Sequence, residues 1–331
     1  MEHPALGGLI VSAVSTAGAG PLVRKWLRRR KSFDHPNERS SHTVPTPRGG
    51  GLACAFGGAV GAGASRLFGA GATPIWVGAS VTLGALGRFD DVASLPPVFR
   101  LGAQVVTGAA AGARIGGPLG AAAGAVAIPS IVNAFNFMDG INGISGGTAA
   151  AWGSVVASDP SLVRSSRAQG ALTAGMGLGF LPYNVPRASM FLGDVGSYLL
   201  GSGIAVTVLE SAFTDGCPNP RAAGRALAPL APYLADTGIT IVRRALRGDA
   251  VTEAHREHAY QRMVHETGWP HWAVSGLVAS ASAACGLVGR SRYGIVAVAP
   301  VVALYLSSPS LARLVISQTG EPVMTLSGER S

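Results

Sequence analysis

Carboxylates and carboxamides recur in short polar segments that follow apolar runs of the sequence. Asp90 and Asp91 come just after a run that ends at Gly87. Adjacent carboxylates in a site can hold a divalent metal ion, shift one another's pKa or act as a base. A solvated helix end is the alternative, although carboxylates at a helix C-terminus oppose the helix dipole. The pair is therefore predicted to be catalytic.

A second polar segment places four side chains at three-residue steps, namely Asn133, Asn136, Asp139 and Asn142. In a helix this spacing puts all four on one face, which lipid would not tolerate. Hydrogen bonds between helices would be one use for such a stripe. Amide and carboxylate oxygens also suit magnesium and the edges of nucleobases, so the stripe is predicted to bind a ligand.

A third segment, Phe191-Leu-Gly-Asp-Val-Gly-Ser, holds a single carboxylate, Asp194, between glycines at the start of an apolar run. Bare backbone at glycine lets a phosphate or a metal ion approach closely. A turn followed by a helix N-cap is the structural alternative. Because the other polar segments also carry candidate ligand-binding side chains, a ligand role is favoured for Asp194.

Two basic segments could neutralise an anionic ligand. His255, Arg256 and His258 lie in a polar stretch with several more arginines, and the two histidines are one turn apart if the stretch is helical. Arg48 ends a segment that also contains Arg39 and His42. Such groups can bind a diphosphate and stabilise charge that develops on it. A solvated basic loop remains the alternative, and two histidines without cysteine or H-E-x-x-H are a weak zinc signal.

Long apolar runs must position these segments. The chain has 331 residues, of which 48% are hydrophobic and only 13% charged, against about 25% charged in soluble domains. A soluble all-α core would leave almost no polar face for water, so we predict an all-α, polytopic membrane protein with about 10 to 11 transmembrane helices, forming a single domain over residues 1–331. The runs are residues 5–23, 50–69, 72–87, 98–114, 118–134, 143–158, 168–182, 195–213, 226–242, 272–289 and 293–308.

Basic residues at 24–31 follow the first run and mark the cytosolic side, which leaves the N-terminus outside. Counting runs from there places every polar segment described above on the cytosolic side. The outward connections, residues 159–167 and 215–225, carry no comparable cluster. One site built from several loops requires this arrangement, whereas a transporter more often places ionisable groups near the bilayer midplane. Basic residues at span ends need no nucleic acid to explain them, and three scattered cysteines have no metal-ligand spacing.

Taken in order, the segments resemble the polyprenyl-phosphate N-acetylhexosamine-1-phosphate transferases, the MraY and WecA type. The matching stretches are residues 36–42, 45–51, 90–91, 133–143, 191–197 and 254–261, which span nearly the whole chain. Residues 39–51 and 255–261 look most like the WecA and WbpL branch, which begins O-antigen or related surface polysaccharides. Two positions depart from the pattern: Asn142 stands where many members have aspartate, and Arg88 where an apolar or aromatic residue is usual.

The resemblance implies a bacterial inner-membrane enzyme with a cytosolic site, Mg²⁺ or Mn²⁺, a UDP-N-acetylsugar donor and an undecaprenyl or other polyprenyl phosphate acceptor; it also allows a homodimer. By motif match, Asp194 would be a metal ligand and Asn136 a second. Phe191 would stack on uracil. The nucleotide site would be lined by Asp139 and Asn142, and the diphosphate held by His255, Arg256 and His258, with Arg48 and Asn133 as further substrate-binding residues.

A membrane carrier is the alternative of another class. In it the same segments would bind a nucleotide sugar or a lipid phosphate without chemistry. A carrier predicts movement of substrate without release of UMP, so the two hypotheses differ in a measurable product.

Overall fold

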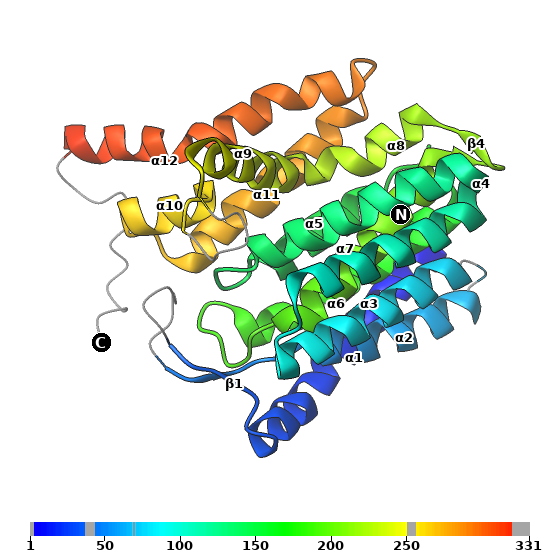
Figure 1. The fold of residues 1–331 in the computed structure, drawn as a ribbon, viewed down its shortest axis with the longest axis horizontal. Helices are drawn as coiled ribbons and strands as arrows, with labels where there is room; N and C mark the ends of the chain where they lie inside the picture. The colour runs from blue at the N-terminus through cyan, green and yellow to red at the C-terminus, as the bar shows by residue number, and fades with distance from the viewer. Residues whose placement is uncertain (1–2, 37–43, 68, 70, 250–255, 320–331) are drawn as a thin grey trace.

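The structure is a bundle of helices with very little strand (Figure 1). The computed structural model describes residues 3–36, 44–67, 69, 71–249 and 256–319. Over these residues the helices are α1 (His3–Arg29), α2 (Gly51–Leu67), α3 (Pro74–Ala93), α4 (Pro97–Met138), α5 (Ile144–Ala157), α6 (Arg164–Asn184), α7 (Gly193–Ala212), α8 (Pro220–Leu227), α9 (Ala231–Arg247), α10 (Ala259–Thr267), α11 (His271–Gly289) and α12 (Ala299–Thr319). Two 3₁₀ turns, η1 (Ala228–Leu230) and η2 (Gly294–Val298), precede α9 and α12.

Two short antiparallel hairpins complete the fold. Strand β1 (Phe33–Asp34) pairs with β2 (Thr46–Pro47), and β3 (Phe213–Thr214) pairs with β4 (Cys217–Pro218). The hairpins lie at opposite ends of the bundle, with β1 near the end of α1 and β4 beside α8 (Figure 1). They order the chain between helices, and Phe213 of β3 is buried beside Gly116 of α4.

The chain is an all-α, multi-pass membrane protein, as predicted. Five stretches within helices are long and apolar enough to cross a membrane, judged by length and composition: Ala5–Arg29, Pro97–Met138, Gly193–Ala212, His271–Val288 and Val296–Gln318. Each of the eleven apolar runs overlaps a helix. The count of 10 to 11 spans and the outward N-terminus stay predictions.

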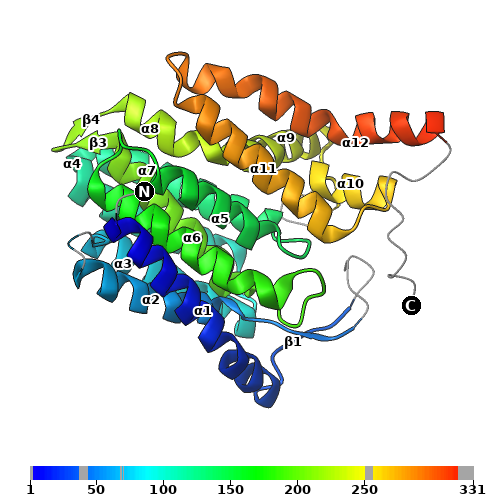
Figure 2. The same cartoon turned by 180° about the vertical axis from the view of Figure 1, so that it is seen from behind.

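Helix α7 forms the centre of the bundle. Of its most apolar 18-residue window 89% is buried, a far larger share than in the other four candidate spans. It packs against α3, α4, α6 and α2 (Figures 1 and 2). Because α7 contacts so many neighbours, whatever fixes its N-terminus also fixes the side chains around it.

Helix α4 is a helical hairpin. Gly116 and Gly117 leave the helical region, and Gly117 has a φ of 60°, which favours glycine. Pro118 then begins the second half, where the missing N–H of proline does no harm. The two apolar runs predicted at 98–114 and 118–134 are therefore the two arms of α4, joined by a turn of two residues.

Glycines let the two arms of α4 meet backbone to backbone. A Cβ added to Gly108 would overlap the carbonyl of Gly124, and one added to Gly112 would overlap the carbonyl of Gly120. Small residues at four-residue spacing are how helices approach closely in lipid. The glycines of both arms thus allow tight packing within this hairpin.

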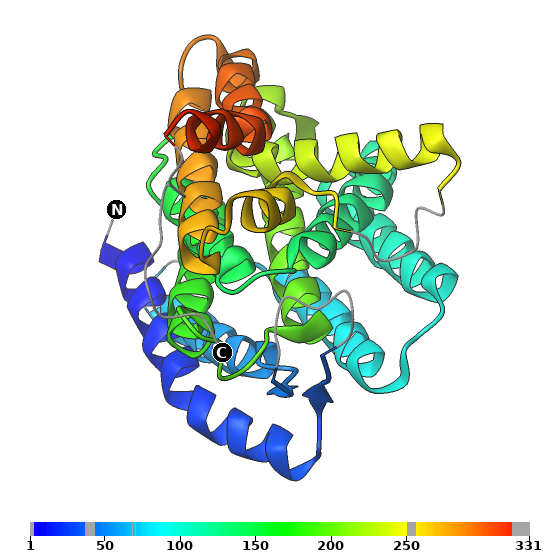
Figure 3. The ribbon, with the colours of Figure 1, turned by 90° about the vertical axis from the view of Figure 1, so that its left-hand side faces the viewer.

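The described residues of the polar loops that were predicted to share one side do lie at one end of the bundle, the end that faces the viewer in Figure 3. The expectation that the opposite end carries no comparable cluster is wrong. There, Asp159 accepts hydrogen bonds from Arg225 at 3.1 and 3.2 Å and lies 3.6 Å from the Nε atom of Arg290. Burial opposes ionisation of Asp159, but hydrogen bonds from the Ser161 N–H and Arg225 lower its pKa. These contacts join the α5–α6 loop to α8 and α11.

The hairpin of α4 can be tested by adding a side chain to its interface. We expect Gly112→Leu to lower thermal stability by several degrees, because overpacking a tight contact costs about 1–3 kcal/mol. Gly102→Leu on the same helix, where an added Cβ meets nothing within 4 Å, is the matched control. The measurement is thermal unfolding of the detergent-purified proteins, and equal melting temperatures for both variants would contradict the close approach.

Candidate active site

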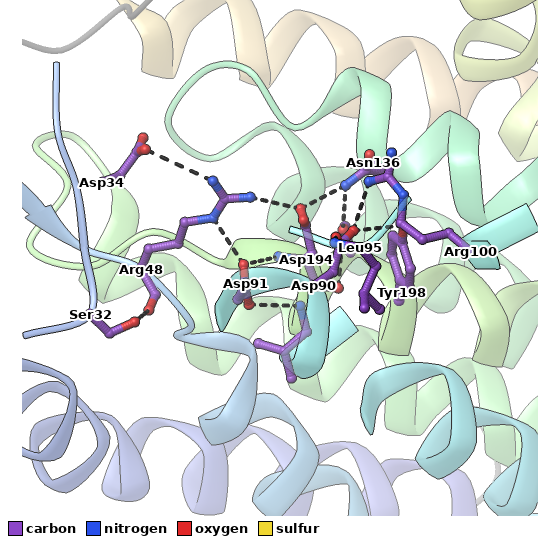
Figure 4. Close-up of polar contacts among 12 residues, drawn as sticks. Ser32, Asp34, Arg48, Asp90, Asp91, Leu95, Arg100, Asn136, Asp194 and Tyr198 are labelled. Carbon is purple, nitrogen blue, oxygen red and sulfur yellow. Dashed lines mark hydrogen bonds and ion pairs between the residues drawn. The ribbon is translucent and has the colours of Figure 1, made fainter. Parts of the chain in front are cut away.

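An arginine bridges two carboxylates at the loop end of the bundle (Figure 4). Arg48 donates through Nε to Asp91 at 2.9 Å and through Nη2 to Asp194 at 2.9 Å, and its Nη1 lies 3.8 Å from Asp34. Burial alone would lower the pKa of Arg48, but attraction to Asp194, Asp91 and Asp34 outweighs it and raises that pKa above its ordinary value. Residues that are up to 160 positions apart therefore share one charged centre.

Asp91 closes the N-terminus of α7. Its carboxylate accepts the N–H of Asp194 at 2.9 Å and the N–H of Val195 at 3.1 Å, and its side chain is fully buried. The first N–H groups of a helix have no partner within the helix and carry a partial positive charge. A carboxylate from α3 thus satisfies them and holds Asp194 in place.

Glycines dock the loop that carries Arg48 onto the start of α7. The N–H groups of Gly49 and Gly50 both donate to the carbonyl of Phe191, and Gly51 donates to Leu192. A Cβ on Gly51 would overlap Gly196. The glycine triplet after Arg48 is therefore explained by packing, since it lets the N-terminus of α2 touch the N-terminus of α7.

Asn136 also belongs to the charged centre. The sequence motifs named it with Asp194 as a second metal ligand, and the two side chains are in contact. Asn136 donates through Nδ2 to Asp194 at 2.8 Å and to the hydroxyl of Ser197 at 3.3 Å. Asn133, one turn earlier, instead pairs with Gln104 of the other α4 arm at 2.7 Å. Of the predicted stripe, Asn136 thus faces the charged centre, while Asn133 joins two helices.

Asp90 points away from Asp91. Its carboxylate accepts the N–H of Leu95 at 2.8 Å and a hydrogen bond from Arg100 at 2.7 Å, and the hydroxyl of Tyr198 donates to it at 3.3 Å (Figure 4). These contacts close the turn between α3 and α4. The adjacent carboxylates are therefore divided between two tasks, and the catalytic role predicted for Asp90 stays a prediction.

Asp139 and Asn142 lie in the loop between α4 and α5, at the same end of the molecule. Burial raises the pKa of Asp139 to about 7; Asp194 and Asp91 act in the same direction and Arg48 acts against it. The charges of the centre therefore act on the pKa of Asp139. Asn142 donates through Nδ2 to the carbonyl of Pro186 at 3.3 Å, next to the loop that carries Phe191.

The basic segment near α10 is partly described. His255 lies outside the described residues, so the spacing of the two histidines stays a prediction; Arg256 and His258 precede α10 and are not helical. His258 is buried, with its Nδ1 atom 3.2 Å from Asp236. Asp236 also accepts the N–H of Ala259 and the hydroxyl of Tyr305, so it fastens the start of α10 to α9 and α12.

Comparisons with known proteins identify the family of the chain. The model of a family described as glycosyl transferase family 4 matches residues 73–212, which include Asp90, Asp91, Asn136 and Asp194. The decaprenyl-phosphate N-acetylglucosaminephosphotransferase of Mycobacterium tuberculosis (strain ATCC 25618 / H37Rv) is 30% identical, over 80% of this chain and 76% of that protein. The chain belongs to glycosyl transferase family 4.

Two further relatives are similar to this chain over most of their length. The enzyme with the same name from Mycobacterium leprae (strain TN) is 28% identical, over 84% of this chain and 81% of that protein. The probable undecaprenyl-phosphate N-acetylglucosaminyl 1-phosphate transferase of Bacillus subtilis (strain 168) is 26% identical, over 77% of this chain and 76% of that protein. The resemblance found in the sequence motifs is thereby confirmed at the level of the family.

The charged centre of this glycosyl transferase has the chemistry of a cation site. Asp91 and Asp194 already hold the positive guanidinium of Arg48 between them, and carboxylate and amide oxygens are the ligands that Mg²⁺ prefers. Among the described residues, no group of three or more His, Cys, Asp or Glu side chains has metal-binding geometry. The residues therefore fit Mg²⁺ if phosphate or water oxygens supply the remaining ligands.

Sequence reasoning missed three residues that the structure brings into these networks. Asp34 approaches Arg48, Arg100 pairs with Asp90, and Asp236 anchors His258. Asp236 had a signal, because a lone carboxylate inside an apolar run is costly unless it has partners. The other two had none, since their partners depend on how β1 and the α3–α4 turn fold back.

The raised pKa of Asp139 makes a prediction about stability. The unfolded chain ionises Asp139 near its ordinary pKa of 3.8, whereas the folded chain keeps it protonated up to about 7. Folding therefore binds a proton between these values, and this contribution to stability is lost as the pH rises toward 7. We expect the melting temperature of Asp139→Asn to exceed that of the wild type by a margin that grows from about pH 4 to about pH 7 and then levels off.

The control for this measurement is Asp215→Asn, which changes an exposed carboxylate at the other end of the bundle. Its melting temperature should follow that of the wild type across the same pH range. A constant difference between Asp139→Asn and the wild type would show that Asp139 ionises normally.

Proposed function

We propose that this chain transfers N-acetylglucosamine-1-phosphate from a UDP-sugar to a polyprenyl phosphate and releases UMP. The observation that carries the proposal is the charged centre of Arg48, Asp91, Asp194 and Asn136 at one end of a membrane bundle. The relatives reported above are named for transfer to decaprenyl or undecaprenyl phosphate. A reaction between a lipid phosphate and a water-soluble donor requires a polar site of this kind at the surface of a membrane.

In the proposed reaction an oxygen of the lipid phosphate attacks the sugar-proximal phosphorus of the donor. A new P–O bond forms as the P–O bond to UMP breaks, and UMP leaves with the electron pair. The acceptor phosphate has a second pKa near ~6 and is largely ionised at neutral pH, so a strong base is not required. Positioning and charge stabilisation supply most of the rate.

The chain's own residues have the following parts in this proposal. Arg48 neutralises charge on the diphosphate, and Asp91 positions both Arg48 and the backbone at the start of α7. Phe191 stacks on uracil, while Asp139 and Asn142 line the nucleotide site. Arg256, with His255 and His258, binds the diphosphate, and the buried His258 anchors the described part of this segment to Asp236.

Mg²⁺ or Mn²⁺ belongs to the proposal as the group that binds the diphosphate and withdraws charge from it when present. Asp194 is its proposed ligand, with Asn136 as a second. Both lie within hydrogen-bond distance of one another and beside Arg48. Their oxygen atoms meet the preference of these ions.

The location follows from the charge pattern. Basic residues at 24–31 end α1 at the same end as the site, which supports a cytosolic site in a bacterial inner membrane. An anionic nucleotide sugar does not cross lipid unaided, so a cytosolic donor requires a site on the cytosolic side of the membrane. We propose that the product starts a surface glycan of the O-antigen kind.

An assay of UMP release tests the proposal. Purified protein is given undecaprenyl phosphate and a panel of UDP-N-acetylsugars, with and without Mg²⁺. We expect release that depends on the metal ion and forms a lipid-linked sugar, with a loss of about 100-fold or more in Asp194→Ala. Asp215→Ala, at the opposite end of the bundle, should keep the wild-type rate.

The carrier alternative predicts another result. Folded protein that binds a nucleotide sugar but releases no UMP with any donor would favour a carrier. Full activity in Asp194→Ala would instead remove Asp194 from the site while leaving the transferase reaction in place.

A further inference from the structure

Asp236 is a buried carboxylate on α9 for which the proposed reaction has no direct use. Only 2% of its side chain is exposed. It accepts the N–H of Ala259 at 3.0 and 3.1 Å, the hydroxyl of Tyr305 at 2.7 Å and that of Thr240 at 3.3 Å. The Nδ1 atom of His258 lies 3.2 Å from it. A carboxylate inside an apolar stretch of a membrane protein is costly and by default marks a functional site.

Asp236 does at α10 what Asp91 does at α7. Ala259 is the first residue of α10, and its N–H has no acceptor within the helix. In both places a carboxylate from a neighbouring helix accepts such an N–H group, and negative charge is favoured at a helix N-terminus. Because Asp236 also holds Tyr305 of α12, three helices meet at this one side chain.

The start of α10 carries the basic segment of the candidate active site. Arg256 and His258 are the described members of that segment, and both come within three residues before Ala259. The backbone that places Arg256 is therefore tied to α9 through the contacts of Asp236 with His258 and Ala259.

Tyr260 connects the same point to the loop that carries Asp139. Its ring stacks on that of His258, with the centroids 5.8 Å apart, and is buried. Its hydroxyl donates to the carbonyl of Phe137 at 3.4 Å, at the end of α4. A Cβ added to Gly140 would overlap this hydroxyl, so the ring fills the space beside the loop. A shift at the start of α10 would therefore displace the support of Asp139.

We propose that Asp236 is a positioning residue of the transferase. It holds α10 so that the basic segment and the loop of Asp139 keep a fixed distance from each other on two sides of the donor. The inference rests on the proposed function, which gives Arg256 to the diphosphate and Asp139 to the nucleotide. Asp236 touches neither substrate; it acts through Arg256 and Tyr260, and it governs binding of the donor and not of the acceptor.

An amide could not replace the carboxylate at this junction. An ionised aspartate offers two oxygens that only accept hydrogen bonds, and both are used here by N–H and O–H donors. In Asp236→Asn the amide would turn its NH₂ group toward one of these donors, and a buried donor would lose its partner. The substitution should therefore release the start of α10.

The kinetic test is a double-mutant cycle on the KM for the UDP-sugar, measured by UMP release. We expect Asp236→Asn and Arg256→Gln each to raise this KM about 10-fold and the double variant to raise it about 20-fold, because both changes weaken the same interaction. The KM for undecaprenyl phosphate should stay within about 2-fold. A rise of about 100-fold in the double variant would show that the two residues act independently and would overturn the proposal.

Two further variants guard against a general loss of structure. Tyr305→Phe removes only a hydroxyl from the junction, and we expect it to raise the donor KM about 3-fold. Glu266→Gln is the matched control, because Glu266 also joins α10 to α12, through Arg313 at 3.0 Å, but at an exposed position. It should keep both KM values. An unchanged donor KM in Asp236→Asn and Tyr305→Phe, or an equal rise in Glu266→Gln, would overturn the proposal.

Hydrogen exchange separates the junction from the reaction. Amide exchange of the detergent-purified wild type, Asp236→Asn and Tyr305→Phe is followed by mass spectrometry without substrate. We expect faster exchange in both variants over residues 259–263 and 137–142. Faster exchange in α10 alone would remove the link to the loop of Asp139 and overturn the proposal. These changes are expected whether or not UMP is released, so a failure of the proposed function is told apart from a failure of the junction.

Discussion

The carboxylate of Asp91 at the start of α7 is the contact on which the site depends. It satisfies two N–H groups of the central helix and at the same time holds Arg48. A buried carboxylate is tolerated only when its charge is paired and its oxygens are hydrogen-bonded. Here a helix terminus and a guanidinium do both, so three elements far apart in sequence are fixed by one side chain. Asp194 and Asn136 then take their positions from α7 and α4, which pack together.

Glycine is what allows these charged elements to come so close. The glycines at 49–51 pack against the segment 191–196, and a Cβ added to Gly50 or Gly51 would meet backbone there or an aromatic ring. Small residues on both elements thus let the loop that carries Arg48 pack against the start of α7.

Much of the fold could be predicted from the sequence, because apolar runs report helices directly. The shared end of the polar loops followed from counting those runs, and Asn136, Asp194, Asp91 and Arg48 were singled out by residue type. What could not be predicted was the direction in which each side chain points. Adjacent Asp90 and Asp91 looked like one pair, yet Asp90 turns to Arg100 and Tyr198. Such divisions depend on tertiary contacts, as does the ion-pair cluster around Asp159, which the sequence analysis wrongly discounted.

The two-residue turn of α4 bears on how the protein enters a membrane during synthesis. A transmembrane hairpin with a long polar loop must move that loop through hydrocarbon. Here the turn is Gly116-Gly117, and the charge nearest to it is the single side chain of Arg114. On the insertion scale one arginine at the bilayer centre costs only about 2.5–3.5 kcal/mol. Both arms can therefore be delivered together, already paired through their glycines, before the central helix that packs against them has been translated.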